Sequence, residues 1–122
     1  MLIELFILLF ICHFLCDFTP LSTAWMLKAK QAGKPLLPIL AHAGMHAGTM
    51  FIVLLFFTNL LIAFKLGCFQ LLTHFIIDVW KGRMNSWFPI LRDSTKKSYW
   101  IIFGFDQFLH QLVIVLMVSY LF

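Results

Sequence analysis

The chain has 122 residues, of which 62% are hydrophobic and only 11% are charged, and its formal net charge is +4. A soluble domain usually carries about 25% charged residues, and small soluble domains leave much of their surface in water. These values exclude an ordinary soluble domain and indicate an integral membrane protein. Because the apolar runs are continuous rather than alternating, they predict membrane-spanning helices instead of a β-barrel.

The first apolar run predicts a transmembrane helix over residues 2–18. The helix should end at Thr19-Pro20, because proline disfavours a helical conformation in the residue before it. The run lacks a basic N-terminal region and a small-residue cleavage site, so we expect a retained helix rather than a cleaved signal peptide.

Three further transmembrane helices follow, each long enough to approach the roughly 20 residues that a span requires. We predict them from residue 35 or 36 to about 57, from about 68 to 83, and from about 99 to 120. The connections between helices are expected at residues 19–34, within 58–67, and at 84–98. No internal repeat is present, and the short connections favour an up-down bundle that forms a single domain over residues 1–122.

Basic residues fall almost entirely on one side of this predicted bundle. Lys65 is the exception, and the other eight lie in or beside the first and third connections: Lys28, Lys30, Lys34, Lys81, Arg83, Arg92, Lys96 and Lys97. The positive-inside rule makes that side cytoplasmic and places both termini on the non-cytoplasmic side. The four tryptophans lie on the same side, as an interfacial aromatic belt would. The predicted fold is therefore an all-α integral membrane bundle of four transmembrane helices.

Each predicted helix carries one pair of histidine or aspartate residues spaced four positions apart. The pairs are His13 and Asp17, His42 and His46, His74 and Asp78, and Asp106 and His110. This spacing places both side chains of a pair on one helical face, one turn apart. Eight of the ten histidine and acidic residues are used in this way, which chance would rarely produce. The pattern therefore predicts one shared site.

The four pairs are also predicted to lie at a similar depth. They occupy the C-terminal parts of the first and third helices and the N-terminal parts of the second and fourth, roughly 6–15 Å below the cytoplasmic boundary at about 1.5 Å per residue. Ionisable groups inside a bilayer are costly unless paired and usually mark functional sites. Several buried carboxylates need compensating charge, so we expect the pairs to bind a cation.

Mixed imidazole and carboxylate ligands favour a divalent metal, with Zn first and Mn or Fe as alternatives. A catalytic zinc ion usually has three protein ligands and a water, so eight residues are enough for two ions. The predicted metal ligands are His13, Asp17, His42, His46, His74, Asp78, Asp106 and His110. Lys81 follows Asp78 by three positions and is the predicted substrate-binding residue, although a lysine here could instead extend to the interface.

Weaker signals surround these pairs. Gly44 and Gly48 form a small-residue face that would allow two helices to approach closely. Gln107 and Gln111 are expected to hydrogen-bond to metal ligands or to bridge helices. Three cysteines lie in apolar runs, where buried unreactive thiols are expected, and Cys16 is at most an outer neighbour of the site.

The four pairs, with their neighbours, resemble the motifs of a known family. These motifs are His13-Phe14-Leu15-Cys16-Asp17-Phe18, His42-x-x-x-His46, His74-Phe75-Ile76-Ile77-Asp78-x-x-Lys81 and Asp106-Gln107-Phe108-Leu109-His110, with a lysine at position 28 or 30. By them the chain resembles, over nearly its whole length, the bacterial membrane family called domain of unknown function 3307. The resemblance implies a multi-pass protein of the bacterial inner membrane and no particular activity.

More loosely, the pattern is similar to predicted membrane-bound metal-dependent hydrolases, which also place histidine and aspartate pairs in short apolar helices. Their His-Arg and Thr-His-Ser runs are not reproduced here, and Thr73-His74 is only a fragment of one. This similarity implies hydrolysis as a hypothesis, to be weighed against other functions of the same ligands.

The function expected first is a metal-dependent hydrolase that acts on a phospholipid or lipid-linked phosphoester at the cytoplasmic face. Two metal ions suit phosphoryl displacement, because together they stabilise the attacking and leaving oxygens. The expected partner is membrane lipid, and a homo-oligomer or a membrane partner protein stays open. Anionic headgroups explain the basic loops without nucleic acid.

Three alternatives use the same residues differently. A metal-ion transporter or metal-binding accessory subunit would hold the ion transiently, but no second polar cluster leads to the other side. A redox bundle with haem or two irons is disfavoured, since di-iron sites are rich in glutamate and Glu4 is the only glutamate. A purely structural subunit would leave the four pairs unexplained.

Overall fold

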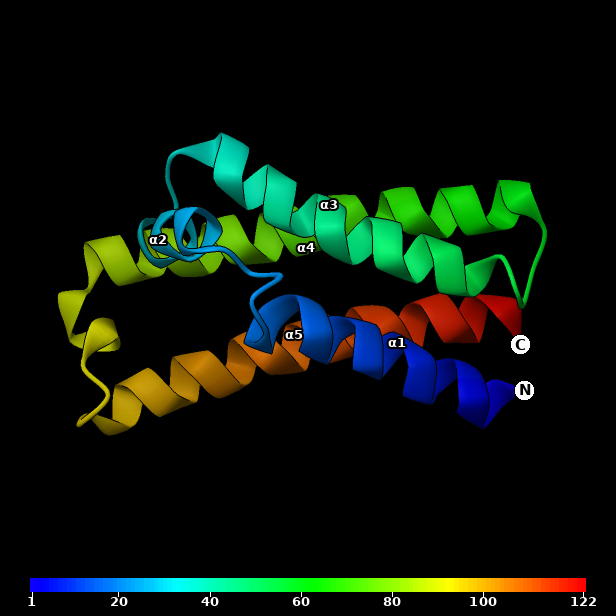
Figure 1. Cartoon of the computed structure of the whole chain (residues 1–122). Coiled ribbons are helices and arrows are strands. Elements are labelled where there is room, and N and C mark those ends of the chain that lie inside the picture. The colour runs from blue at the N-terminus through cyan, green and yellow to red at the C-terminus, as the bar shows by residue number, and fades with distance from the viewer.

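The computed structural model describes residues 1–122 as five α-helices and one short 3-10 helix, without a strand. The elements are α1 (Leu2–Phe18), α2 (Ala24–Ala32), α3 (Leu36–Leu54), α4 (Leu60–Trp87), η1 (Pro89–Arg92) and α5 (Lys97–Leu121). The four long helices run along a common axis, and α2 and η1 lie at the end opposite the two termini (Figure 1). The predicted all-helical class is confirmed.

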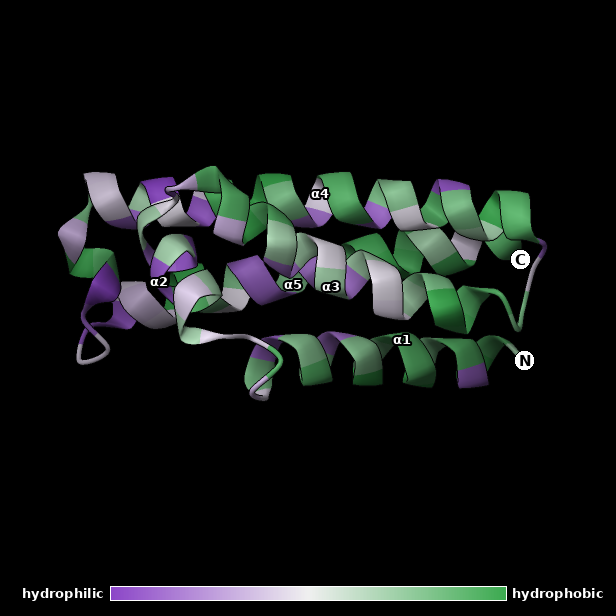
Figure 2. Cartoon of the chain, turned by 45° about the horizontal axis from the view of Figure 1, so that its top comes forward, coloured by the Kyte–Doolittle hydropathy of each residue, from purple (hydrophilic) through white to green (hydrophobic).

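Three helices, α3, α4 and α5, are long and apolar enough to cross a membrane. Their surfaces are mainly hydrophobic, and hydrophilic residues gather toward the end that holds α2 and η1 (Figure 2). Helix α1 has 17 residues, which is at the lower limit of the roughly 17–25 residues that cross a bilayer. The chain is therefore a membrane protein by its helices, and the fourth span remains a prediction.

The predicted connection between the first two long helices is wrong in part, because it contains the separate helix α2. The Thr23 side chain accepts a hydrogen bond from the Met26 backbone N–H at the start of α2, and Gly33 ends it in the left-handed conformation, with φ of 69°. These are ordinary helix-capping signals. A nine-residue helix lacks the long apolar run by which the other helices are recognised.

The predicted third helix is also too short at both ends. Helix α4 begins at Leu60 because the Asn59 side chain caps it, accepting a hydrogen bond from the Ile62 backbone N–H at 3.0 Å. It continues to Trp87, four residues beyond the predicted end. Helix α3 ends at Leu54, before the predicted end at about residue 57, so the turn at residues 55–59 lies mostly ahead of the expected interval of 58–67.

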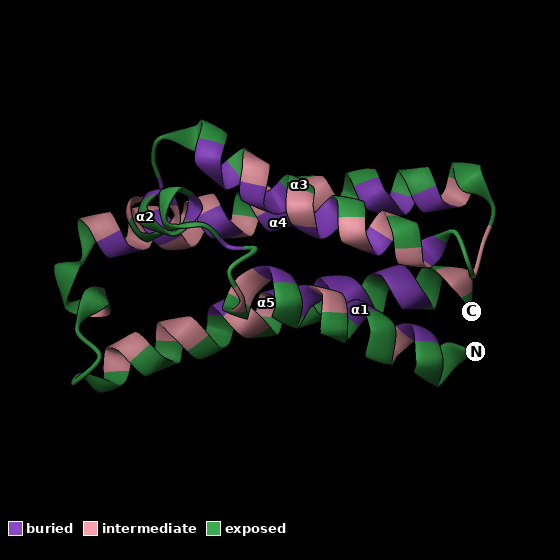
Figure 3. Cartoon of the chain, viewed as in Figure 1, coloured by how far each residue is buried: buried purple, intermediate pink, exposed green.

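The interior of the bundle has an apolar half and a polar half. Ten buried hydrophobic residues form one cluster near the termini: Leu5, Leu9, Met50, Leu54, Ala63, Leu66, Val113, Ile114, Met117 and Val118. Buried residues face inward along all four long helices (Figure 3). Toward α2 the buried positions change from aliphatic side chains to histidines and aspartates.

Two glycines bring the backbones of α2 and α4 into contact. A Cβ atom added to Gly82 would lie 2.2 Å from the Gly33 nitrogen and 2.4 Å from the Lys30 oxygen. A Cβ atom added to Gly33 would lie 2.6 Å from the Arg83 nitrogen. Such distances are far inside van der Waals contact, so this crossing requires glycine both at the end of α2 and within α4.

The close approach predicted at Gly44 and Gly48 is wrong, because an added Cβ atom would meet nothing within 4 Å at either position. Both residues are exposed. His42 and His46 occupy the inward face of α3, and a residue two positions away lies on nearly the opposite side of an α-helix. The glycines therefore face outward.

Candidate metal centre

All eight predicted metal ligands converge inside the polar half of the bundle. Each of their side chains is less than 8% exposed, and those of His42, His46 and Asp78 are fully buried. The i,i+4 spacing accounts for this result, because each long helix presents one pair on its inward face. The convergence that the sequence predicts is present in the structure.

A first group of potential ligands joins α1, α3 and α4. Asp17, His42, His46 and His74 each offer one ligand atom, and these atoms all lie within 4.8 Å of one another. The Asp17 Oδ1 atom is 2.8 Å from His42 Nε2 and 3.1 Å from His46 Nε2. Three imidazoles and a carboxylate at this spacing match the ligand types and number of a zinc site.

A second group joins α4 and α5 and shares one residue with the first. It consists of His74, Asp78 and His110, whose ligand atoms also lie within 4.8 Å of one another. The two Asp78 oxygens lie 3.2 Å from His74 Nε2 and 3.3 Å from His110 Nε2. The His74 ring stacks between His46 and His110, with centroid separations of 3.8 and 4.1 Å. His74 therefore connects two adjacent ligand groups.

Two of the predicted ligands lie beside these groups rather than in them. His13 Nε2 is 3.3 Å from Asp17 Oδ2 and 3.1 Å from Gln107 Oε1. Asp106 lies 3.5 Å from His110 Nε2 on one oxygen and 3.5 Å from Lys81 Nζ on the other. The structure brings both residues to the centre, and their role as metal ligands stays a prediction.

Several polar atoms of the second group have no hydrogen-bond partner. They include the Nε2 atoms of His74 and His110 and both carboxylate oxygens of Asp78, although these atoms lie within ion-pair distance of one another. Buried polar atoms are normally hydrogen-bonded. Unpartnered ligand atoms within 4.8 Å of one another fit a divalent cation, which would accept a lone pair from each of them.

Outer contacts hold the ligand rings from behind. Gln70 Nε2 is 3.4 Å from His74 Nδ1, and Ser22 Oγ is 3.5 Å from His42 Nδ1. Sequence reasoning missed both residues, although Gln70 precedes His74 by four positions and shares its helical face. Gln107 makes the contact expected of it, whereas Gln111 is exposed. Cys16 is buried and lies 3.5 Å from the Thr49 hydroxyl, outside both ligand groups.

Lys30 is the main site residue that the sequence analysis did not identify as one. Its Nζ atom lies 3.0 Å from His42 Nε2, 3.3 Å from Asp17 Oδ1 and 3.6 Å from Asp78 Oδ2. Burial acts to lower the pKa of this ammonium group, but the attraction of Asp78 and Asp17, with a further carboxylate nearby, more than offsets burial and raises the pKa. Lys30 is therefore a charged neighbour of both ligand groups.

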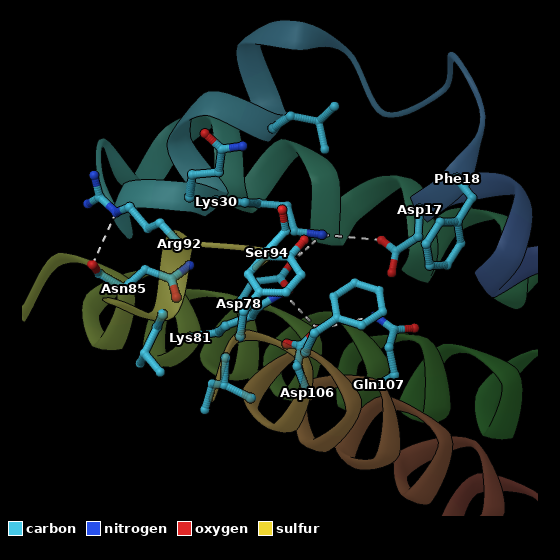
Figure 4. A pocket seen from close by; sticks show the side chains of 16 residues that line it. Asp17, Phe18, Lys30, Asp78, Lys81, Asn85, Arg92, Ser94, Asp106 and Gln107 are labelled. Atoms are coloured by element: carbon cyan, nitrogen blue, oxygen red, sulfur yellow. Dashed lines mark hydrogen bonds and ion pairs between the residues drawn. The ribbon is translucent and has the colours of Figure 1, made fainter. Parts of the chain in front are cut away.

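A cavity of about 530 Å³ lies beside the two groups, and residues of α2 and η1 form part of its lining. Asp17, Asp78 and Asp106 reach it from the ligand side, and Lys81 lines it as well (Figure 4). The Lys81 Nζ atom also lies 5.0 Å from the centre of the Phe103 ring. The volume is within the range of about 300–1,000 Å³ that is typical of small-molecule sites.

A family model described as "Protein of unknown function (DUF3307)" matches residues 5–122. The chain belongs to this family. The resemblance seen in the four motifs is thereby confirmed, and the looser similarity to membrane-bound hydrolases receives no support from the match. No curated protein and no solved structure matches the chain. The function of this DUF3307 member must therefore be argued from its site.

Proposed function

We propose that the chain is a membrane-embedded hydrolase with two divalent metal ions, acting on a phospholipid or lipid-linked phosphoester at the cytoplasmic membrane face. The observation that carries this proposal is the pair of ligand groups that share His74 at the side of a cavity. Neighbouring groups could hold two ions close together, and two metal ions can stabilise both the attacking and the leaving oxygen of a phosphoryl displacement.

The ligand types favour Zn, with Mn or Fe as alternatives, because imidazole and carboxylate suit all three ions. Such ions would supply an activated water at neutral pH. The residues around them would position the substrate: Lys81 lines the cavity and carries the positive charge for an anionic substrate oxygen. Gln70 and Ser22 would orient the imidazoles of His74 and His42 from behind.

The proposed location is the bacterial inner membrane, with α1 as the fourth span. Eight of the nine basic residues lie in or beside the segments that hold α2 and η1, and this charge favours a cytoplasmic position for that end. The cavity opens at the same end, where lipid headgroups would meet it. The extensive exposed apolar surface fits lipid and leaves room for a second membrane chain.

The first test is the metal content of the detergent-purified protein by elemental mass spectrometry. We expect about two Zn, Mn or Fe ions per chain, with fewer ions in the His46→Ala and Asp78→Ala variants. Asp93→Ala is the matched control, because Asp93 is an exposed aspartate outside the cavity, and it should bind the same amount as the unmodified chain. No bound metal after growth with several metal supplements would contradict the proposal.

Activity is tested next with the metal-loaded protein. A panel of phospholipids, lipid pyrophosphates and generic phosphoesters is incubated with the unmodified chain and with Asp78→Ala, and released phosphate or headgroup is measured. The proposal predicts release by the unmodified chain alone. If the folded, metal-loaded protein releases nothing from the whole panel, hydrolysis is ruled out as its function.

Transport of metal ions is supported less well by this arrangement. The ligands occupy one half of the bundle, and the ten-residue apolar cluster fills the other half. An ion leaving the ligand groups toward the termini would have to pass through that cluster. Uptake of Zn, Mn or Fe into proteoliposomes, abolished by His46→Ala, would favour transport over hydrolysis.

A further inference from the structure

Three cations from three different elements line the cavity. They are Lys30 on α2, Lys81 on α4 and Arg92 at the end of η1. The sequence predicts only Lys81 as a substrate-binding residue, because α2 and η1 lie in segments that it predicts to be connections. The ligand that we propose for these cations rests on the proposed function, and it narrows the class of substrate that the same site would bind.

The two lysines are partly neutralised by the potential metal ligands. Lys30 lies within ion-pair distance of Asp17 and Asp78, and Lys81 within that distance of Asp106. Three carboxylates against two ammonium groups leave the ligand side of the cavity close to neutral. Without bound metal, the two lysines therefore contribute little net positive charge to the binding of an anion.

Arg92 is different, because no carboxylate lies within ion-pair distance of it. Its Nε atom donates to the Asn85 carbonyl oxygen at 3.1 Å, and its Nη2 atom donates to the Ser86 hydroxyl at 3.3 Å. These bonds hold the guanidinium against the end of α4 and leave other N–H donors free. Arg92 lies at the far side of the cavity from Asp17 (Figure 4).

Two divalent ions would reverse this balance. Their charge exceeds that of the three carboxylates, so the cavity, with Lys30, Lys81 and Arg92 in its lining, would become strongly positive. A zwitterionic phosphodiester headgroup, which has no net charge, would compensate little of it. A phosphomonoester or a pyrophosphate carries about two or more negative charges near neutral pH, since the second phosphate pKa is about 6.

We propose that this cavity binds a phosphomonoester or pyrophosphate group, held by Lys30, Lys81 and Arg92 once divalent metal occupies the ligand groups. Metal and anion then bind cooperatively, because each removes a charge imbalance that the other creates, and such coupling is reciprocal. Apolar side chains in the same lining, such as Leu27, Leu91 and Phe103, would contact the part of the substrate that adjoins the phosphate.

The test measures binding of inorganic phosphate and inorganic pyrophosphate, independently of any reaction. The full chain is reconstituted in phosphatidylcholine nanodiscs, loaded with metal, freed of excess metal, and dialysed to equilibrium against each radiolabelled anion. Binding is expected to the metal-loaded chain and to disappear after chelation. Equal binding with and without metal, or no binding to the loaded chain, would overturn the proposal.

Charge variants test the three cations. Arg92→Gln, Lys30→Gln and Lys81→Gln should each weaken phosphate binding about tenfold or more, because a hydrogen bond to a charged group contributes roughly that factor. Lys65→Gln, at the opposite end of the bundle, is the matched control and should change binding less than about twofold. Unchanged binding in all three cavity variants would contradict the assignment.

Arg92→Gln is the most informative of these variants, since Arg92 is exposed and lies outside the ligand groups. Its metal content and helicity should equal those of the unmodified chain, so a lost anion site cannot be attributed to a lost fold. Arg92→Lys keeps the charge and should retain part of the binding. If Arg92→Lys and Arg92→Gln bind phosphate as tightly as the unmodified chain, Arg92 has no part in the site.

Two sources of the anion are distinguished by competition. Phosphatidic acid added to the nanodiscs should displace labelled phosphate if the group belongs to a lipid, whereas displacement by soluble phosphate esters alone identifies a soluble source. Either result supports a phosphomonoester or pyrophosphate site. Displacement by phosphatidylglycerol, an anionic phosphodiester lipid, as strong as that by phosphatidic acid would overturn it.

The outcome also separates this inference from the proposed function. Metal-dependent phosphate binding without cleavage of any substrate would leave the anion site standing and remove the hydrolase. Cleavage of zwitterionic phosphodiester lipids without phosphate binding would support the hydrolase and remove the anion site.

Discussion

The two halves of this bundle are built from the same helices but differ in what fills them. Near the termini, side chains such as Leu5, Met50 and Met117 form a closed apolar cluster. Toward α2, the same helices contribute histidines and aspartates with unpartnered polar atoms, and the three aspartates line a cavity. The apolar half can stabilise the bundle by packing alone, whereas the polar half offers two groups of ligand atoms that we propose bind metal ions.

The sharpest way to separate the halves is to remove the shared ligand. His74→Ala should lower the metal content from about two ions per chain to about one or fewer, because the second ligand group keeps only Asp78 and His110, whereas the first keeps three ligands. Elemental mass spectrometry measures this. Retention of both ions would show that His74 does not connect the groups.

A substitution in the apolar half should instead lower the stability of the fold and leave the metal content unchanged. Met50→Ala removes a fully buried side chain from the apolar cluster and should lower the free energy of unfolding by about 2–5 kcal/mol. Metal content of the folded protein should stay unchanged. The free energy of unfolding is measured by following unfolding in detergent with circular dichroism. If metal is lost in parallel, the halves are not independent.

The crossing of α2 on α4 can be disturbed without touching a ligand. Gly82→Ala places a Cβ atom against the Gly33 and Lys30 backbone, so α2 must shift, at a cost of about 1–3 kcal/mol. Lys30 would move with it. Gly44→Ala is the control, because nothing lies within 4 Å of its new Cβ atom and alanine favours a helix by about 1 kcal/mol. Thermal unfolding compares the two, and equal melting temperatures would refute the crossing.

The smallest expected effect concerns a contact behind the ligands. Gln70→Ala removes the hydrogen bond to His74 Nδ1 and should weaken metal affinity by about 10–100-fold, as loss of such supporting contacts usually does. Competition with a calibrated chelator measures the affinity. Gln111→Ala, an exposed glutamine on α5, should leave it unaltered. The same loss in both variants would mean that Gln70 does not position the ring.

Sequence reasoning succeeded where a signal is local to one helix. Each histidine or aspartate pair has a four-residue spacing, which defines a face without reference to the rest of the chain. The lengths of the apolar runs also predicted the number of long helices, although they did not predict the short helix α2. Sequence reasoning failed where two segments meet. Gly44 and Gly48 were predicted to form a packing face, whereas the close contact is made by Gly33 and Gly82.

What the sequence alone determined is the membrane character, the four long helices and the eight residues that share their inward faces, because hydrophobic length and helical periodicity are properties of single segments. Tertiary structure alone decided that His74 joins two ligand groups, that Lys30 reaches both of them, and that Arg92 lines the cavity beside them. These relations depend on how α2 crosses α4 and how η1 packs against α4 and α5. The periodicity of one helix carries no information about its distance from another.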